Sequence, residues 1–312
     1  MQKIVIISGA TAAGKSPFAL SLAKKCNGVI INADSMQIYS GLPILSAQPP
    51  KEECKIVKHY LYSILKPEER RSVGIWIKLA QAEIDKARRM RRVPIVVGGT
   101  GMYISSLING LPPIPDIKEI TRRSVKELYE KLGHEKFFDL VSTVDKKTCD
   151  KIKKNDKQRL LRAYEVFAQT GKPLSQWQKV RRIKPYKKNE FLHINIEIPR
   201  EELYKKINKR YEQMLQGDTI INEVKDFLKK YPKAIEENYT IKNTLGFLEI
   251  KDFLDGKISH KKMIEIATQK TRNYAKRQLT WFRNQFKSSD IIKLTKINVH
   301  TPIQICKLMK KG

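Results

Sequence analysis

The stretch GATAAGKS, from Gly9 to Ser16, constrains the fold more than any other part of the chain. It matches the phosphate-binding pattern G-x-x-x-x-G-K-[ST]. An apolar, β-branched run (Lys3 to Ser8, KIVIIS) precedes it, and apolar residues at helical spacing follow it in FALSLAKKC. This motif requires a strand, then a glycine loop, then a helix. The sequence therefore predicts a phosphate-binding loop that joins a buried strand to a helix.

The residue types in this stretch suit phosphate chemistry. Gly9 and Gly14 permit backbone conformations that other residues avoid, so that successive N–H groups converge at the positive end of the helix. Lys15 adds a mobile positive charge, and the Ser16 hydroxyl is a ligand for Mg²⁺. The motif does not identify the phosphate compound. We expect binding by Gly9, Ala10, Thr11, Ala12, Ala13, Gly14, Lys15 and Ser16.

Two further apolar runs end in functional side chains. GVIINAD ends at Asp34, and VPIVV from Val93 to Val97 leads into GGTGMY. Ligands of parallel α/β sheets bind beyond the carboxyl ends of the strands, which predicts Asp34 beside the phosphate loop. A helix N-cap is the alternative role for Asp34. Gly98 and Gly99 stand where many phosphate-loop enzymes carry an acidic metal ligand, and this disfavours a simple ATPase or kinase.

The chain is long enough for one large domain or two smaller ones. LPPIPD, at 111–116, contains three prolines and marks a boundary. A basic, helical region follows, and FLHINIEI at 191–198 alternates like a strand that returns to the sheet. We predict an α/β fold in which residues 1–115 and 186–312 form a phosphate-loop core with a parallel sheet flanked by helices. Residues 116–185 are predicted to form an all-helical insertion.

Charge and cysteine content bound the partners and the compartment. The 62 Lys and Arg against 32 Asp and Glu give a net charge of +30, which favours a nucleic acid or another polyanion as partner. A generally lysine-rich surface is the alternative. For Arg159 and Arg162 of the insertion, a solvated helix face is an equal alternative to RNA contact. The four cysteines form no C-x-x-C motif, which favours reduced thiols in the cytoplasm. No apolar stretch is long enough to span a membrane, and we expect a cytoplasmic monomer.

Taken together, the motifs resemble one family. They are GATAAGKS, INADSMQIY, VPIVVGGTGMYI, NDKQRLLRAYEVFAQTGKPLS and TRNYAKRQLTWFRNQF, and they occur in the order found in tRNA dimethylallyltransferases. The resemblance extends from about Lys3 to Phe286, and the last motif is the most specific. It implies transfer of a dimethylallyl group from dimethylallyl diphosphate, with Mg²⁺, to N6 of the adenine at position 37 of tRNA. It also implies that the insertion grips the anticodon stem.

The resemblance also implies roles for individual residues. The phosphate loop would hold the diphosphate, with Ser16 at the metal. Asp34 matches the general base, Thr100 a residue that lines the reaction channel, and Arg210 an arginine near the diphosphate. The positions that match tRNA contacts are Asp34, Ser35, Met36, Gln37, Thr100, Arg122, Gln158, Arg159, Leu160, Leu161 and Arg162.

Two departures from the family pattern bear on turnover, and two other functions compete. Gln48 stands where the family carries a lysine, and Phe247 replaces a tyrosine. A small-molecule kinase shares the loop and the carboxylate but leaves the basic insertion unexplained. A non-catalytic RNA-binding protein is the other alternative. Labelled dimethylallyl diphosphate mixed with tRNA separates the three, because only a transferase moves the label to RNA.

Overall fold

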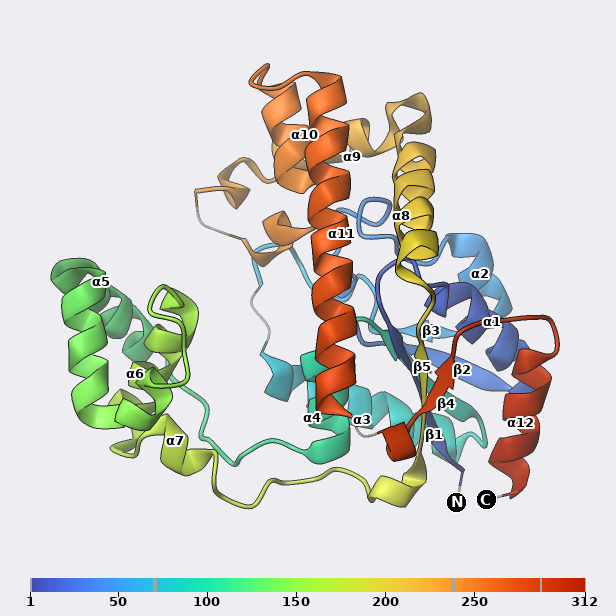
Figure 1. Cartoon of the computed structure of the whole chain (residues 1–312), viewed down its shortest axis with the longest axis horizontal. Coiled ribbons are helices and arrows are strands. Elements are labelled where there is room, and N and C mark those ends of the chain that lie inside the picture. Colours follow the sequence, from blue (N-terminus) through green and yellow to red (C-terminus); the bar gives the residue numbers. More distant parts are fainter. Residues whose placement is uncertain (1, 70–71, 237–238, 287, 312) are drawn as a thin grey trace. The chain divides into compact units, whose positions relative to one another are not determined.

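A parallel sheet lies at the centre of the larger part of the chain (Figure 1). The computed structural model describes residues 2–69, 72–236, 239–286 and 288–311, and among these six strands are ordered β3-β2-β4-β1-β5-β6. Every pairing is parallel, so that all carboxyl ends lie at one edge. The strands are β1 (Ile4–Gly9), β2 (Gly28–Asn32), β3 (His59–Tyr60), β4 (Val93–Gly98), β5 (Phe191–Ile196) and β6 (Ile292–Leu294).

Helices account for most of the remaining structure. Those outside the insertion are α1 (Lys15–Cys26), α2 (Lys51–Ile56), α3 (Val73–Arg89), α4 (Gly101–Asn109), α8 (Arg200–Leu215), α9 (Thr219–Lys230), α10 (Phe247–Leu254), α11 (His260–Gln285) and α12 (Thr301–Lys311). Short 3₁₀ turns are η1 (Lys188–Glu190), η2 (Gln216–Asp218), η3 (Pro232–Ala234), η4 (Thr240–Asn243) and η5 (Ser288–Asp290). The predicted α/β fold with a parallel sheet and flanking helices is confirmed.

The chain divides into two compact units, residues 1–108 with 185–312 and residues 109–184. The second unit contains α5 (Glu119–Cys149), α6 (Lys157–Thr170) and α7 (Leu174–Trp177), and its core includes Phe137, Val141 and Leu160. Asp156 caps α6 by accepting from the Arg159 N–H at 3.2 Å, and Gly171 ends it in the left-handed conformation. These units differ by a few residues from the predicted boundaries at 115 and 185.

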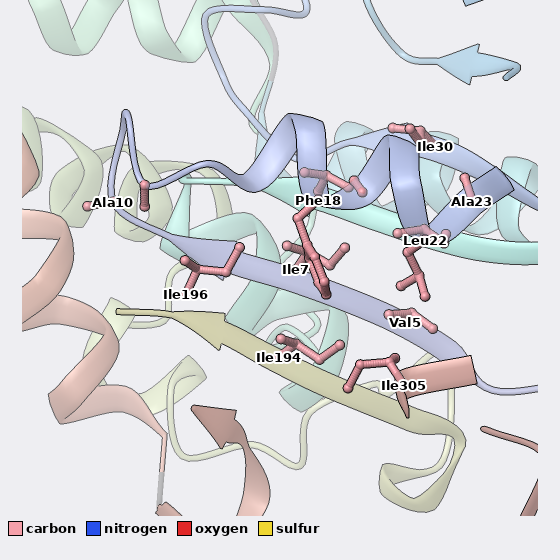
Figure 2. Packing of buried hydrophobic residues seen from close by; sticks show 14 of the residues in the cluster. Val5, Ile7, Ala10, Phe18, Leu22, Ala23, Ile30, Ile194, Ile196 and Ile305 are labelled. Atoms are coloured by element: carbon pink, nitrogen blue, oxygen red, sulfur yellow. The ribbon is translucent and has the colours of Figure 1, made fainter. Parts of the chain in front are cut away.

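Both faces of the sheet are buried, as expected for parallel strands with helices on each side. Val5 and Ile7 of β1 pack with Phe18 and Leu22 of α1, and Ile305 of α12 joins the same cluster (Figure 2). On the alternate positions of β1, Ile4 and Ile6 are also fully buried. This packing fixes α1 against the sheet, and with it the loop that precedes the helix.

Glycine at the end of β4 permits a very close approach of two strand ends. A Cβ built on Gly98 would lie 2.1 Å from the carbonyl oxygen of Ala33, which directly follows β2. The Ala33 N–H in turn donates to the Val97 carbonyl at 2.8 Å. Because the obstructing atoms belong to the backbone, no side-chain rotation relieves the clash. The residues that follow β2 and β4 therefore depend on this glycine for their separation.

We expect Gly98→Ala to lower the free energy of unfolding by about 1–3 kcal/mol or more, the cost of overpacking a tight site. The matched control is Gly74→Ala in α3, whose added Cβ meets only the Ser72 hydroxyl oxygen, at 3.7 Å. Alanine favours a helix over glycine, so this control should be neutral or stabilising. Urea unfolding of both variants measures the difference. Equal stability of the two variants would contradict the backbone contact as the constraint.

Candidate active site

The phosphate loop has the conformation that its glycines predict. Gly9 (φ 145°), Ala12 (φ 62°) and Gly14 (φ 91°) all have positive φ. A Cβ on Gly9 would lie 2.5 Å from the Ile196 carbonyl oxygen, so the start of the loop is also too crowded for a side chain. Helix α1 begins at Lys15, and no side chain caps its N-terminus. The free N–H groups of its first turn form a site suited to an anion.

Lys15 is a half-buried cation at this site. Its Nζ donates to the Ala10 carbonyl at 2.7 Å, within the loop. Burial lowers the pKa of Lys15 from 10.5 to about 8, the nearby Arg210 adds to this effect, and the Asp34 carboxylate opposes it. A bound diphosphate would stabilise the charged form.

Arg210 reaches the loop from α8. Its Nη2 donates to the Thr11 hydroxyl at 3.1 Å. Burial lowers the pKa of Arg210, and the Asp34 carboxylate again opposes that effect. The structure thus brings together Lys15, Asp34 and Arg210, three charged side chains that lie far apart in the sequence.

Asp34 lies just beyond β2, and its backbone is firmly held. The Asp34 N–H donates to Asn32 Oδ1 at 2.7 Å, and Asn32 Nδ2 donates to the Asp34 carbonyl at 3.0 Å. The carboxylate oxygen Oδ1 accepts from the Met36 N–H at 2.9 Å and so closes a local turn. Residues 35–38 form a turn and not a helix, so the alternative role of helix N-cap is wrong. Oδ2 makes no hydrogen bond within the described part of the chain. That oxygen is available to a substrate.

Thr100 connects the loops that follow β2 and β4. Its Oγ1 accepts from the Ser35 N–H at 2.9 Å and donates to Ser35 Oγ at 3.3 Å. The Thr100 N–H donates to the Ala33 carbonyl at 3.2 Å. Thr100 therefore fixes the segment that carries Asp34, whether or not its hydroxyl also meets a substrate.

Met36 and Gln37 continue this segment and remain half-buried. Gln37 Nε2 donates to the Ser46 and Ala47 carbonyls at 3.0 and 2.7 Å, which secures the next loop. Gln48, one of the family departures, braces the same loop by donating to the Tyr39 carbonyl at 2.8 Å. Phe247, the other departure, is fully buried and packs edge-on against Phe227. Both departures therefore have structural contacts in this chain.

The oxygen donors near the loop fit a magnesium ion that takes most of its ligands from a diphosphate. Ser16 is exposed in the first turn of α1, where its hydroxyl is accessible. Among the described residues there is no cluster of three His, Cys, Asp or Glu side chains that would form a closed metal site. Mg²⁺ commonly binds through few protein groups and several phosphate oxygens.

The second unit contains the predicted contact segment on α6 and one further arginine on α5. Gln158 and Arg159 are exposed, and Arg159 pairs with Asp156 at 3.3 Å. The Arg162 guanidinium lies 3.8 Å from Glu165, and Arg122, from α5, lies near the same carboxylate. Leu161 is half-buried. Leu160 is fully buried in the unit's core, so its side chain offers no surface to RNA.

The role of α11 at this site was not predicted from the sequence. Gln278, which is only 5% exposed, accepts from the Thr11 N–H and donates to the Gly99 carbonyl. A Cβ on Gly101 would lie 2.2 Å from the Trp281 ring, so Trp281 has a packing role on the loop after β4. The signal was the glycine run itself: Gly99 and Gly101 leave room for side chains of a helix. Its identity could not be read from the run.

The shifted pKa of Lys15 predicts a pH dependence for anion binding. Diphosphate binding requires the ammonium, so affinity should be lost as the pH rises through about 8, approaching tenfold per pH unit above it. Stability of the free protein has the opposite dependence, because the unfolded chain holds this proton more tightly and loses it only near pH 10.5.

Calorimetric titration with inorganic pyrophosphate across this range measures the effect. Lys15→Met serves as the matched control, because it retains the ionisation of pyrophosphate itself and removes that of the lysine. The variant should bind weakly and show no loss centred near pH 8. Wild-type and variant curves of the same shape would contradict the assignment.

Comparison with known protein sequences gives matches over most of the chain. Family models described as IPP transferase and isopentenyl transferase match residues 37–285 and 2–64. The chain is 41% identical to the tRNA dimethylallyltransferase of Pelagibacter ubique over 286 residues, covering 92% of this chain and 90% of that protein. It is also 41% identical to the tRNA dimethylallyltransferase of a Wolbachia from Brugia malayi, covering 93% and 95%.

Solved structures give the same result. A tRNA isopentenylpyrophosphate transferase from Staphylococcus epidermidis superposes with a TM-score of 0.69 at 33% identity, covering 100% of this chain and 99% of that one. A eukaryotic dimethylallyltransferase, described as acting on tRNA, gives a TM-score of 0.83 at 25% identity, covering 99% and 78%. The chain therefore belongs to the tRNA dimethylallyltransferase family, whose model is named IPP transferase.

Proposed function

We propose that this protein transfers the dimethylallyl group of dimethylallyl diphosphate to N6 of the adenine at position 37 of tRNA, beside the anticodon. The products are N6-dimethylallyladenosine and diphosphate. The observation that carries the proposal is the convergence of a phosphate loop and its half-buried Lys15 with the Asp34 carboxylate. One side of this arrangement suits a diphosphate leaving group, and the other suits an amine that must lose a proton.

The cationic side of the site would stabilise the diphosphate leaving group. As the allylic carbon–oxygen bond breaks, the electron pair leaves with the diphosphate, whose oxygens gain charge. Lys15, the N–H groups at the start of α1 and Arg210 would stabilise that charge. Ser16 would hold Mg²⁺ together with diphosphate oxygens, and the ion would supply further neutralisation of the leaving group.

Asp34 and its neighbours would position the acceptor adenine and take up its proton. The adenine amino group is a weak nucleophile, so it requires close positioning and a base for its proton. Asp34 Oδ2 is the candidate base. Asn32 and the Met36 N–H hold Asp34 in place. Thr100 holds the segment through Ser35, and Ser35, Met36 and Gln37 lie next along the chain to contact the nucleotide.

The charge of the chain supports RNA as the acceptor. Beyond the net charge of +30, a hollow of about 520 Å³ along α11 is lined by Asn273, Lys276, Arg277, Thr280, Trp281, Asn284 and Gln285. The Arg277 guanidinium carbon also lies over the Tyr274 ring, 5.6 Å from its centre. Cations beside aromatic rings suit phosphates and unstacked bases. We propose that Arg122, Gln158, Arg159 and Arg162 add contacts to the anticodon stem.

We further propose a cytoplasmic monomer. The four cysteines, Cys26, Cys54, Cys149 and Cys306, are free thiols, as suits a reducing compartment. No helix of the described residues is long and apolar enough to cross a membrane. Sedimentation of the purified protein tests the monomer.

Incubation with labelled dimethylallyl diphosphate and bulk tRNA tests the function. Label should enter RNA and depend on a divalent cation. ATP hydrolysis without transfer would instead indicate a kinase-like enzyme. RNA binding with neither reaction would indicate a non-catalytic binding protein.

Asp34→Asn should lower single-turnover transfer by about 10² to 10⁴, the usual contribution of a general base. Asparagine retains the size and the acceptor for the Met36 N–H, so folding and pyrophosphate affinity should be kept. Transfer is measured at saturating donor and tRNA, with a melting curve for each protein. A folded variant with the wild-type rate would remove Asp34 from the chemistry.

Arg159→Ala with Arg162→Ala should weaken tRNA binding and flatten its salt dependence, because each phosphate contact adds about −0.7 to −0.9 to the log–log slope. The charge-matched control is Lys131→Ala with Lys136→Ala, two exposed positions on α5 of the same unit. Filter binding at several salt concentrations compares the pairs. If both pairs give the same slope and affinity, the arginines belong to a general solvated surface.

A further inference from the structure

The amide of Gln278 joins two loops that have different tasks in the proposed reaction. Its Oε1 accepts from the Thr11 N–H at 2.8 Å, in the phosphate loop. Its Nε2 donates to the Gly99 carbonyl at 2.9 Å, in the loop after β4. The two partners fix the orientation of the amide, because a backbone N–H requires the oxygen and a carbonyl requires the nitrogen. No charged or apolar side chain of this size satisfies both.

The surroundings leave this amide little freedom. A Cβ on Gly99 would lie 2.3 Å from Gln278 Nε2, so the amide occupies the space that any other residue at position 99 would fill. The next helical turn of α11 presses Trp281 onto Gly101 in the same way. The hydrogen bond to the Gly99 carbonyl is buried and the one from the Thr11 N–H is partly buried, so leaving either partner unpaired is costly.

Each end of the bridge leads to a proposed substrate site. Thr11 also accepts the hydrogen bond from Arg210, so α8 and α11 hold the same residue of the phosphate loop. At the other end, Gly99 directly precedes Thr100, whose hydroxyl fixes the Ser35 N–H beside Asp34. The buried Gln278 side chain therefore connects the phosphate loop, through Gly99 and Thr100, to the segment that carries Asp34.

We propose that Gln278 is a positioning residue that fixes the position of the phosphate loop relative to the loop supporting Asp34, so that the donor and the acceptor are aligned for reaction. This rests on the proposed transfer reaction. Gln278 bonds to backbone groups of both loops and is not assigned a contact with either substrate. Its loss should therefore change turnover and the geometry of the diphosphate site, and leave tRNA affinity unchanged.

The test uses Gln278→Ala, Gly99→Ala and the double variant in the full-length protein. Gln278→Ala should weaken inorganic pyrophosphate binding about two- to tenfold, the range of one ordinary hydrogen bond. It should also lower kcat for transfer, with the Kd for tRNA unchanged. Gly99→Ala should act in the same direction, because its methyl displaces the amide while α11 keeps its sequence. In the double variant the methyl finds the vacated space, so the second change should add little.

Gln269→Ala is the matched control. It lies on the same helix, is exposed, and bonds only side chains of α11, Asn273 and Arg272, within the described residues. It should leave pyrophosphate affinity and kcat at the wild-type values. Melting temperatures of all variants identify any loss of folding, and Gly99→Ala supplies the test if Gln278→Ala does not fold.

Two results would overturn the inference. One is a folded Gln278→Ala or Gly99→Ala protein with wild-type pyrophosphate affinity and wild-type kcat, which would make Gln278 a helix anchor only. The other is full additivity in the double variant, which would show that the two positions act separately. Failure of the proposed function has a different signature, because the wild-type protein itself would then transfer no label while pyrophosphate binding still reports on Gln278.

Discussion

The parallel pairing of β1 with β4 on one side and β5 on the other is the constraint on which the site depends. Register in this sheet places Ser8 beside Gly98 and beside Asn195, so the chain leaves all three strands at one level. Strands that run in the same direction necessarily deliver their loops to the same edge. The phosphate loop, the segment with Asp34 and the glycine run after β4 meet there because of that geometry.

Electrostatics at this edge follows from burial. Lys15 and Arg210 are both harder to keep charged than exposed cations are, and the Asp34 carboxylate offsets part of that cost. A diphosphate would offset more, so the free site is poised for an anion. The position after β4 where related phosphate-loop enzymes carry an acidic group is instead glycine. Gln278 of helix α11 fills that space. Asp34 is the carboxylate to which we assign proton transfer.

Much of the fold was predictable from local pattern. The run Val93–Val97 became β4, the alternating run that starts at Phe191 became β5, and the phosphate motif lies between a strand and a helix. The order of the strands and the short strands β3 and β6 were not predicted, because they depend on tertiary pairing. The site was predictable where a motif carries its own chemistry, as at Lys15. Gln278 was not, because its role arises only when a distant helix meets two loops.

The most direct test of the account is a structure of the protein with inorganic pyrophosphate and an RNA anticodon stem–loop. Diphosphate oxygens should lie within reach of Lys15 and the first turn of α1. The N6 atom of an unstacked adenine should lie within about 2.6–3.2 Å of Asp34 Oδ2, the distance that proton transfer requires. Pyrophosphate bound outside the loop, or an adenine whose amino group points away from Asp34, would contradict it.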